Sequence, residues 1–133
     1  PLRSNTDKKA LQEGLQDGTI DAICSHHEPL AKTAKQAPFA ECKPGISNFD
    51  TFMGLACQLV KEGILTPTQL VEKIALNPAK IAGIEASYHQ TGGAVLVDPS
   101  LTWTVTKESM MSQGKNTPFI NSELTGKVEQ VYF

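Results

Sequence analysis

Apolar and polar positions in the first part of the chain follow two different periods. Ser4 or Asn5, both favourable N-cap residues, begins an amphipathic segment that stops at Gly18, and this pattern predicts a helix. The apolar, β-compatible run Ile20–Cys24 follows at once and predicts a short buried strand. The segment His26–Gly45 is rich in proline and lysine and has no sustained period, so it predicts a long loop.

Two more helical segments are predicted after this loop. Asn48 is a good N-cap for residues with apolar positions at i, i+3, i+4 and i+7, and this helix is expected to end at Gly63. The sequence TPTQ, which begins at Thr66, combines an N-cap, a proline at the first helical position and a glutamine that completes a capping box. Asn77–Pro78 is expected to break that helix, and one more turn is expected to close at Gly83.

The last third of the chain has the alternation that is typical of strands. The runs GGAVLVDP, TWTVT and GKVEQVYF predict three short strands, with turns at Gly92–Gly93, Asp98–Pro99 and Gly126. Two or three isolated strands are marginally stable, so these need partners that the sequence does not contain. The chain also begins with PLRSN and no methionine. We therefore expect it to be a piece of a longer polypeptide.

The order of these elements indicates an α/β fold. We predict the C-terminal portion of a TIM-type (β/α) barrel followed by strands of a small flanking β-domain, incomplete on its own. Residues 1–84 would be the barrel segment, with the last helix–strand units and the helices after them. Residues 85–133 would supply the flanking strands.

Composition excludes several classes of function. The net charge of −2 and the scattered basic residues argue against nucleic-acid binding, because no basic stripe could neutralise phosphates. The sequence has no apolar run of membrane-spanning length and no signal-peptide pattern. Cys24, Cys42 and Cys57 are an odd number with no CxxC pair, so we expect reduced thiols and a cytoplasmic location.

The sequence SHHEPL after the first predicted strand is the strongest candidate for chemistry, because catalytic residues of βα barrels lie where strands end. Side chains alternate along a strand, so His26 and His27 would point in different directions and could not easily ligate one ion. Loop histidines, one of them partly buried, are therefore the favoured interpretation from spacing alone. Glu28 is expected to be solvated, and His89 receives no role.

Four collinear segments carry a family resemblance. PLR, GTIDAI followed by SHHEP, LNPAKIAG, and KNTPF resemble the C-terminal part of dihydroorotase, a member of the amidohydrolase group of metal-dependent barrels. Any one of these segments is a weak signal, but the resemblance covers nearly the whole chain in order. It implies that Ile20–Ser25 is the eighth barrel strand and that the closing strands belong to the β-domain beside the barrel.

The resemblance implies a zinc-dependent hydrolase that interconverts carbamoyl-aspartate and dihydroorotate in pyrimidine biosynthesis. The family motif after strand eight reads Ser/Thr-Asp-His-Ala-Pro-His. Its Asp binds metal and takes a proton from metal-bound water, and its last His contacts the substrate carboxylate. By this resemblance His26 holds the catalytic and metal-binding Asp position, and Leu30 holds the last His position. Pro44 and Gly45 hold a later step whose main chain contacts substrate.

Both departures from the motif change the expected chemistry. Imidazole at His26 could ligate zinc or accept a proton, but it brings no negative charge and has a different reach. The isobutyl group of Leu30 can neither donate a hydrogen bond nor pair with a carboxylate. Two such changes within five residues favour a catalytically inactive dihydroorotase-like protein. By family analogy, such a protein would be a structural partner of aspartate carbamoyltransferase.

Two alternatives remain open at this point. The full-length chain could be an active zinc-dependent dihydroorotase or a related cyclic-amide hydrolase, with His26 as ligand or base. The chain could instead be a self-associating binding module. A barrel remnant has unpaired edges, so we expect a homo-oligomer. Zinc is not expected to bind this fragment, because the resemblance places the HxH metal pair on earlier strands.

Overall fold

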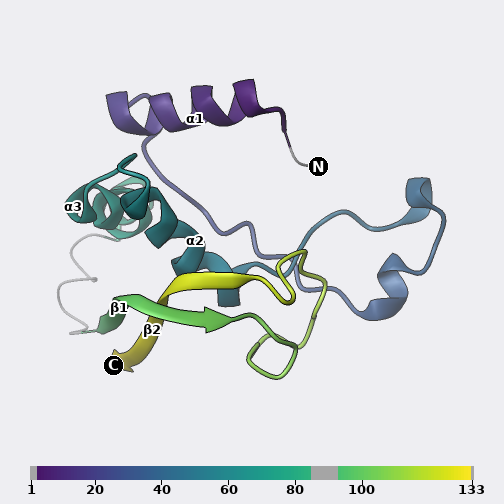
Figure 1. Ribbon diagram of the computed structural model, residues 1–133. Coiled ribbons are helices and arrows are strands. Elements are labelled where there is room, and N and C mark those ends of the chain that lie inside the picture. Colours follow the sequence, from purple (N-terminus) through teal and green to yellow (C-terminus); the bar gives the residue numbers. More distant parts are fainter. Residues whose placement is uncertain (1–2, 85–92, 133) are drawn as a thin grey trace. The chain divides into compact units, whose positions relative to one another are not determined.

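The computed structural model (Figure 1) describes residues 3–84 and 93–132. These residues form two compact units. The first unit contains Pro1–Cys24, Ala56–Leu96 and Gln130–Phe133, and the second contains Ser25–Leu55 and Val97–Glu129. The division of the parent fold into residues 1–84 and 85–133 stays a prediction.

The first unit opens with the predicted helix, α1 (Asn5–Asp17). The Ser4 side chain accepts the backbone N–H of Asp7, and the Asp7 carboxylate accepts the backbone N–H of Ser4, which makes a capping box. Gly18 ends the helix at φ 86°, in the left-handed region that favours glycine. The predicted start and stop are confirmed. Leu15 of this helix belongs to the buried cluster of the unit, with Ala56, Leu65 and Leu70.

The segment Ile20–Cys24 is extended but is not a strand, so the prediction of a short buried strand is wrong for this chain. Ile23 is only half-buried and Cys24 is exposed. The segment is hydrogen-bonded to a helix: the Ile23 N–H donates to the Lys73 carbonyl at 2.9 Å, and the Lys73 ammonium donates to the Ile20 carbonyl. A strand requires a neighbouring strand, and the described residues of this unit provide none beside it.

The helical region after Thr66 is continuous. The Thr66 capping box begins α3 (Pro67–Val71) as predicted, and the chain then passes through a π-helical turn, η3 (Glu72–Leu76), into α4 (Asn77–Ile81). The expected break at Asn77–Pro78 is therefore wrong. A π turn shifts the hydrogen-bond pattern by one residue, and this accommodates a proline that has no N–H to donate. The predicted stop is confirmed, since Gly83 has φ 68° and the Ile84 N–H returns to the Ala79 carbonyl at 3.0 Å.

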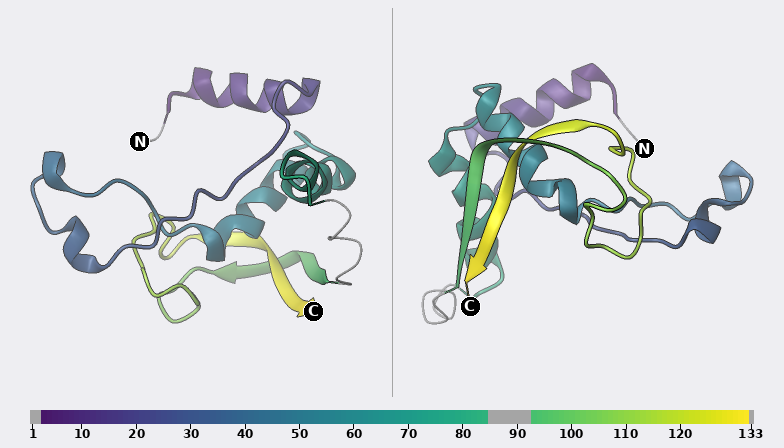
Figure 2. Two further views of the ribbon diagram at one scale, coloured as in Figure 1. Left: turned by 180° about the vertical axis from the view of Figure 1, so that it is seen from behind. Right: turned by 60° about the horizontal axis from the view of Figure 1, so that its bottom comes forward.

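The second unit contains the predicted long loop (Figures 1 and 2). Two short 3₁₀ turns, η1 (Lys32–Lys35) and η2 (Phe39–Glu41), are its regular structure. The Lys35 ammonium closes the loop by donating to the carbonyls of Lys43 at 2.6 Å and Gly45 at 2.9 Å.

Helix α2 (Phe49–Lys61) begins directly after Asn48 and ends before Gly63, as predicted. The Asn48 side chain accepts the Thr51 hydroxyl at 2.9 Å. No described helix, α2 included, is long and apolar enough to cross a membrane. All three cysteines are free thiols, and burial raises the pKa of the Cys57 thiol on this helix.

The last part of the chain forms one two-stranded sheet of β1 (Ala94–Thr104) and β2 (Glu123–Tyr132), so the expectation of three strands is wrong (Figure 2). The strands run antiparallel. Asp98–Pro99 lies inside β1, because the Asp98 carboxylate accepts the N–H groups of Ser100 and Leu101 and turns the backbone without ending the strand. Gly126 likewise lies inside β2, at φ 100°. Of the predicted Gly92–Gly93 turn only Gly93 is described.

Candidate functional site

The two segments that the family resemblance maps to a binding site lie side by side in the second unit. His27 and Ile46 form an isolated parallel bridge, and the Glu28 N–H donates to the Ile46 carbonyl at 2.8 Å. The residues His26–Leu30 thus lie beside Pro44–Gly45, although they are far apart in sequence. We call these two segments the paired loops.

Asn116 holds the paired loops together. Its side-chain oxygen accepts the Leu30 N–H at 2.7 Å, and its side-chain nitrogen donates to the carbonyls of Glu28 at 3.1 Å and Gly45 at 3.3 Å. Its own carbonyl accepts the Ser47 N–H at 3.1 Å. One amide side chain therefore bonds both segments. Sequence reasoning gave it no role, although it is the second residue of the KNTPF segment, and that segment was the signal that pointed to it.

His26 is exposed and has φ 44°, in the left-handed region that a residue with a Cβ rarely adopts. A residue held in this region costs on the order of 1–2 kcal/mol, which the surrounding hydrogen bonds must offset.

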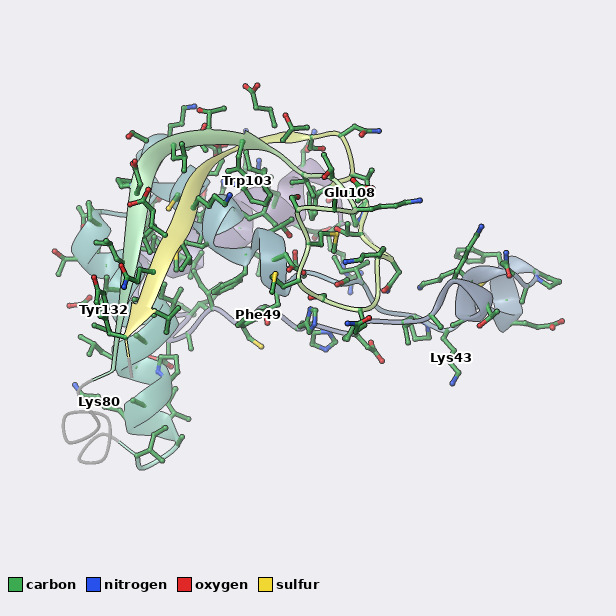
Figure 3. All side chains as sticks on the ribbon, turned by 90° about the horizontal axis from the view of Figure 1, so that it is seen from below. Lys43, Phe49, Lys80, Trp103, Glu108 and Tyr132 are labelled. Carbon is green, nitrogen blue, oxygen red and sulfur yellow. The ribbon has the colours of Figure 1, made fainter. Side chains whose placement is uncertain are left out.

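His27 has a structural role that the sequence did not indicate. Its Nδ1 accepts the N–H groups of Asn48 at 3.1 Å and Phe49 at 2.9 Å, at the start of α2. An accepting Nδ1 places the ring proton on Nε2. The imidazole also lies against the ring of Phe49, which is labelled in Figure 3. The ring centroids are 5.8 Å apart and the planes are at 59°. His27 therefore caps a helix, and its Nδ1 is occupied.

Glycines allow the closest approaches at the paired loops. A Cβ at Gly114 would lie 2.5 Å from the Leu30 nitrogen and 2.8 Å from the Pro29 carbonyl carbon, so the backbone of Leu30 packs directly on this glycine. Gly45 has φ 105°, and a Cβ there would lie 2.2 Å from the Glu28 carboxylate. Beside these glycines, Leu30 is half-buried and Pro44 is exposed.

Asp50 ties α2 to the segment that precedes Asn116. Its carboxylate accepts the Met111 N–H at 2.7 Å, the Ser112 N–H at 3.2 Å and the Ser112 hydroxyl. Partial burial raises the pKa of this carboxyl, but the hydrogen bonds from Ser112 and Met111 lower it by more. The pKa of Asp50 therefore lies below its ordinary value of 3.8.

The described residues do not assemble a complete metal site. Within 3–84 and 93–132, no three His, Cys, Asp or Glu side chains are grouped so that they could hold an ion. His26 holds the metal position of the mapped motif, and the Nδ1 of His27 is engaged by α2. His89 lies outside the described residues.

Sequence comparison finds relatives along nearly the whole chain, although no protein-family model matches it. A dihydroorotase from Syntrophus aciditrophicus is 44% identical over 131 residues, which are 96% of this chain and 31% of that protein. A dihydroorotase-like protein from Pseudomonas aeruginosa is 39% identical over 131 residues, with the same coverage of 96% and 31%. This chain thus spans about a third of the length of these curated relatives.

Solved structures show the fold. A dihydropyrimidinase from Brevibacillus agri matches 99% of this chain and 31% of its own, with a TM-score of 0.87 and 21% identity. The inactive dihydroorotase-like domain of the Chaetomium thermophilum CAD-like multifunctional protein also covers 99% of this chain and 35% of its own, with a TM-score of 0.68 and 22% identity. The predicted fold class, a portion of a TIM-type (β/α) barrel with a small sheet, is confirmed.

Proposed function

We propose, on the premise that this chain is a homologous segment of a dihydroorotase-like protein, that the protein serves pyrimidine biosynthesis without catalysing the dihydroorotase reaction. Its role would then be structural, as a partner of aspartate carbamoyltransferase in the cytoplasm. The partner comes from family analogy, and the location from the expectation of reduced thiols.

The observation that carries the proposal is the pair His26 and Leu30 at the two reactive positions of the motif. A carboxylate beside a metal-bound water supplies negative charge, a hard oxygen ligand and a proton acceptor together. A neutral imidazole at His26 lacks the charge. Leu30 would leave a substrate carboxylate unpaired, at a cost on the order of 2–5 kcal/mol.

The surrounding scaffold supports the same proposal. Asn116, Gly114 and His27 hold the paired loops and the start of α2 with hydrogen bonds and close backbone contacts. A sequence under no constraint would lose such specific contacts as readily as it loses reactive groups. The presence of these contacts beside two altered reactive positions favours a protein that keeps its fold without the chemistry.

Zinc is not assigned to this chain. The family's metal would need a complete set of ligands, and His26 is the one candidate that the mapped motif offers within the described residues. No proton transfer or water activation is therefore derived through a metal here. In a longer protein, ligands from other segments would decide whether an ion binds.

An active hydrolase is the second candidate, and His26 itself is the observation that favours it. Imidazole is a common zinc ligand and a competent base, and His26 is exposed. Pro44 and Gly45 also remain in place beside it. The protein would then be a zinc-dependent dihydroorotase or a related cyclic-amide hydrolase.

The test of lost catalysis is a dihydroorotate hydrolysis assay of the longer protein that we expect to contain this chain, with and without added zinc. We expect no turnover above the buffer rate. Turnover of about 1 per second or faster, within the usual range for enzymes, would reject the proposal in favour of the active hydrolase.

The partner is tested separately by sedimentation of the longer protein with purified aspartate carbamoyltransferase. We expect a complex that sediments faster than either component. Independent sedimentation at micromolar concentrations would remove the partnership and leave the question of catalysis to the hydrolysis assay.

A further inference from the structure

The backbone on both sides of His26 is bonded to one short segment of the second unit, residues 46–49, which we call the clamp. Before His26, the Asn48 side chain donates to the Ser25 carbonyl at 3.0 Å. This carbonyl belongs to the planar peptide group that precedes the His26 Cα. The bond therefore holds that peptide plane from one side.

Two further contacts hold the chain after His26. The His27 Nδ1 accepts two N–H groups at the start of α2, at 3.1 and 2.9 Å. The Glu28 N–H donates to the Ile46 carbonyl at 2.8 Å, which holds the peptide plane between His27 and Glu28. Both contacts come from the clamp, so His26 lies between two parts of the chain that the same segment holds.

The clamp is itself anchored in the interior. Ser47 and Thr51 are both 0% exposed. The Thr51 hydroxyl donates to the Asn48 side-chain oxygen at 2.9 Å, and the Ser47 N–H donates to the Asn116 carbonyl at 3.1 Å. Additional segments of a longer protein can only add to this burial. The clamp therefore does not depend on what covers the surface of the chain.

The left-handed conformation of His26, with φ 44°, lies between the held peptide groups. We propose that Asn48 and His27 are positioning residues, which hold position 26 in this conformation and so fix the direction in which its side chain leaves the backbone. Position 26 is the catalytic and metal-binding position of the family motif, so the clamp orients whichever side chain stands there. The proposal is independent of whether the protein catalyses hydrolysis.

A comparison of glycine and alanine at position 26 tests whether the left-handed conformation is imposed. Glycine adopts a positive φ without the steric cost that alanine has there, although glycine loses more entropy on folding. If position 26 is held left-handed, H26G should protect the Glu28 amide from exchange about two- to fivefold better than H26A. The protein used is the longer one that we expect to contain this chain. Residue 26 is not adjacent to Glu28, so both variants have the same intrinsic exchange rate at this amide.

The same comparison is then made with the clamp weakened. The N48A background removes the donor to the Ser25 carbonyl, and H27A removes the acceptor of the two N–H groups of α2. The T51V background is the matched control, because it removes the hydroxyl that bonds Asn48 but leaves the bond from Asn48 to Ser25.

We expect a ratio of H26G to H26A protection of about two to five in the wild-type and T51V backgrounds, and of about one or less in N48A and H27A. A general loss of stability lowers both protections equally and leaves the ratio unchanged. The Leu70 N–H, which donates to the Thr66 carbonyl at 2.9 Å in the first unit, shows that each background remains folded. A ratio of one or less in the wild-type background overturns the proposal. A ratio that stays the same in both N48A and H27A overturns it equally.

Discussion

Replacing Asn116 by alanine should release the paired loops from one another. The change removes the acceptor of the Leu30 N–H at 2.7 Å and the donor to the Glu28 and Gly45 carbonyls at 3.1 and 3.3 Å. A net contribution of about 1 kcal/mol for each hydrogen bond gives a loss of about 2–3 kcal/mol. The Leu30 N–H is partly buried, so it would not regain a full bond to water.

Amide hydrogen exchange measures this loss where it occurs. The Glu28 N–H donates to the Ile46 carbonyl at 2.8 Å and reports separation of the two segments. Its protection should fall by about 30- to 150-fold in N116A, which is the factor that corresponds to 2–3 kcal/mol. The Leu30 amide should lose its protection as well, because its acceptor is gone.

Two further variants make the result specific. The N116D variant keeps an acceptor for Leu30 but sets a carboxylate oxygen against the carbonyls of Glu28 and Gly45, so it should lose at least as much protection as N116A. Alanine at the exposed Gln113 is the matched control and should change protection little. If N116A and Q113A agree within about 0.5 kcal/mol, the role given to Asn116 is refuted.

Three other substitutions test neighbouring parts of the account. The G114A variant should lower the denaturant midpoint by an amount equivalent to about 1–3 kcal/mol, because its Cβ would lie 2.5 Å from the Leu30 nitrogen. The control G93A, whose Cβ would lie 3.5 Å from the nearest atom, should leave the midpoint unchanged. The D50N variant should be less stable than wild type at pH 7, and the difference in stability should shrink as the pH falls below about 4. A carboxyl whose pKa is lowered by folding stabilises the fold above its unfolded pKa, and this stabilisation is lost as the carboxyl protonates. An unchanged difference at about pH 3 would contradict this. The K73M variant should cost about 1–2 kcal/mol by leaving the Ile20 carbonyl without its donor, whereas K80M, at an exposed position, should not.

The helix boundaries could be predicted because they depend on neighbouring residues alone. The N-cap at Ser4, the capping box at Thr66 and the stops at Gly18 and Gly83 are all present as expected. Each is a local hydrogen-bond pattern that a few residues determine.

The strands could not be predicted as well, because pairing depends on distant residues. Ile20–Cys24 has a strand-like sequence but bonds to η3, since the described residues give it no partner strand. Asp98–Pro99 was expected to end a strand. Instead, the Asp98 carboxylate accepts the Ser100 N–H, and β1 continues past the turn. Turn residues predict a change of direction but not whether the strand continues.

The connections of the candidate site could not be predicted from the sequence. The sequence pointed to His26, Leu30, Pro44 and Gly45 only through family resemblance, and their roles stay predictions. That His27 caps α2 could not be read from the sequence, because the two are separated by about twenty residues of loop. Side chains that bridge such distances become visible only in three dimensions.

The most direct test of the central claim is a crystal structure of the longer protein grown with zinc and dihydroorotate. The account predicts that no zinc is ligated by His26 and that no substrate carboxylate lies against Leu30 and the Pro44–Gly45 main chain. A metal bound through the His26 ring, with dihydroorotate or carbamoyl-aspartate held beside Gly45, would contradict it.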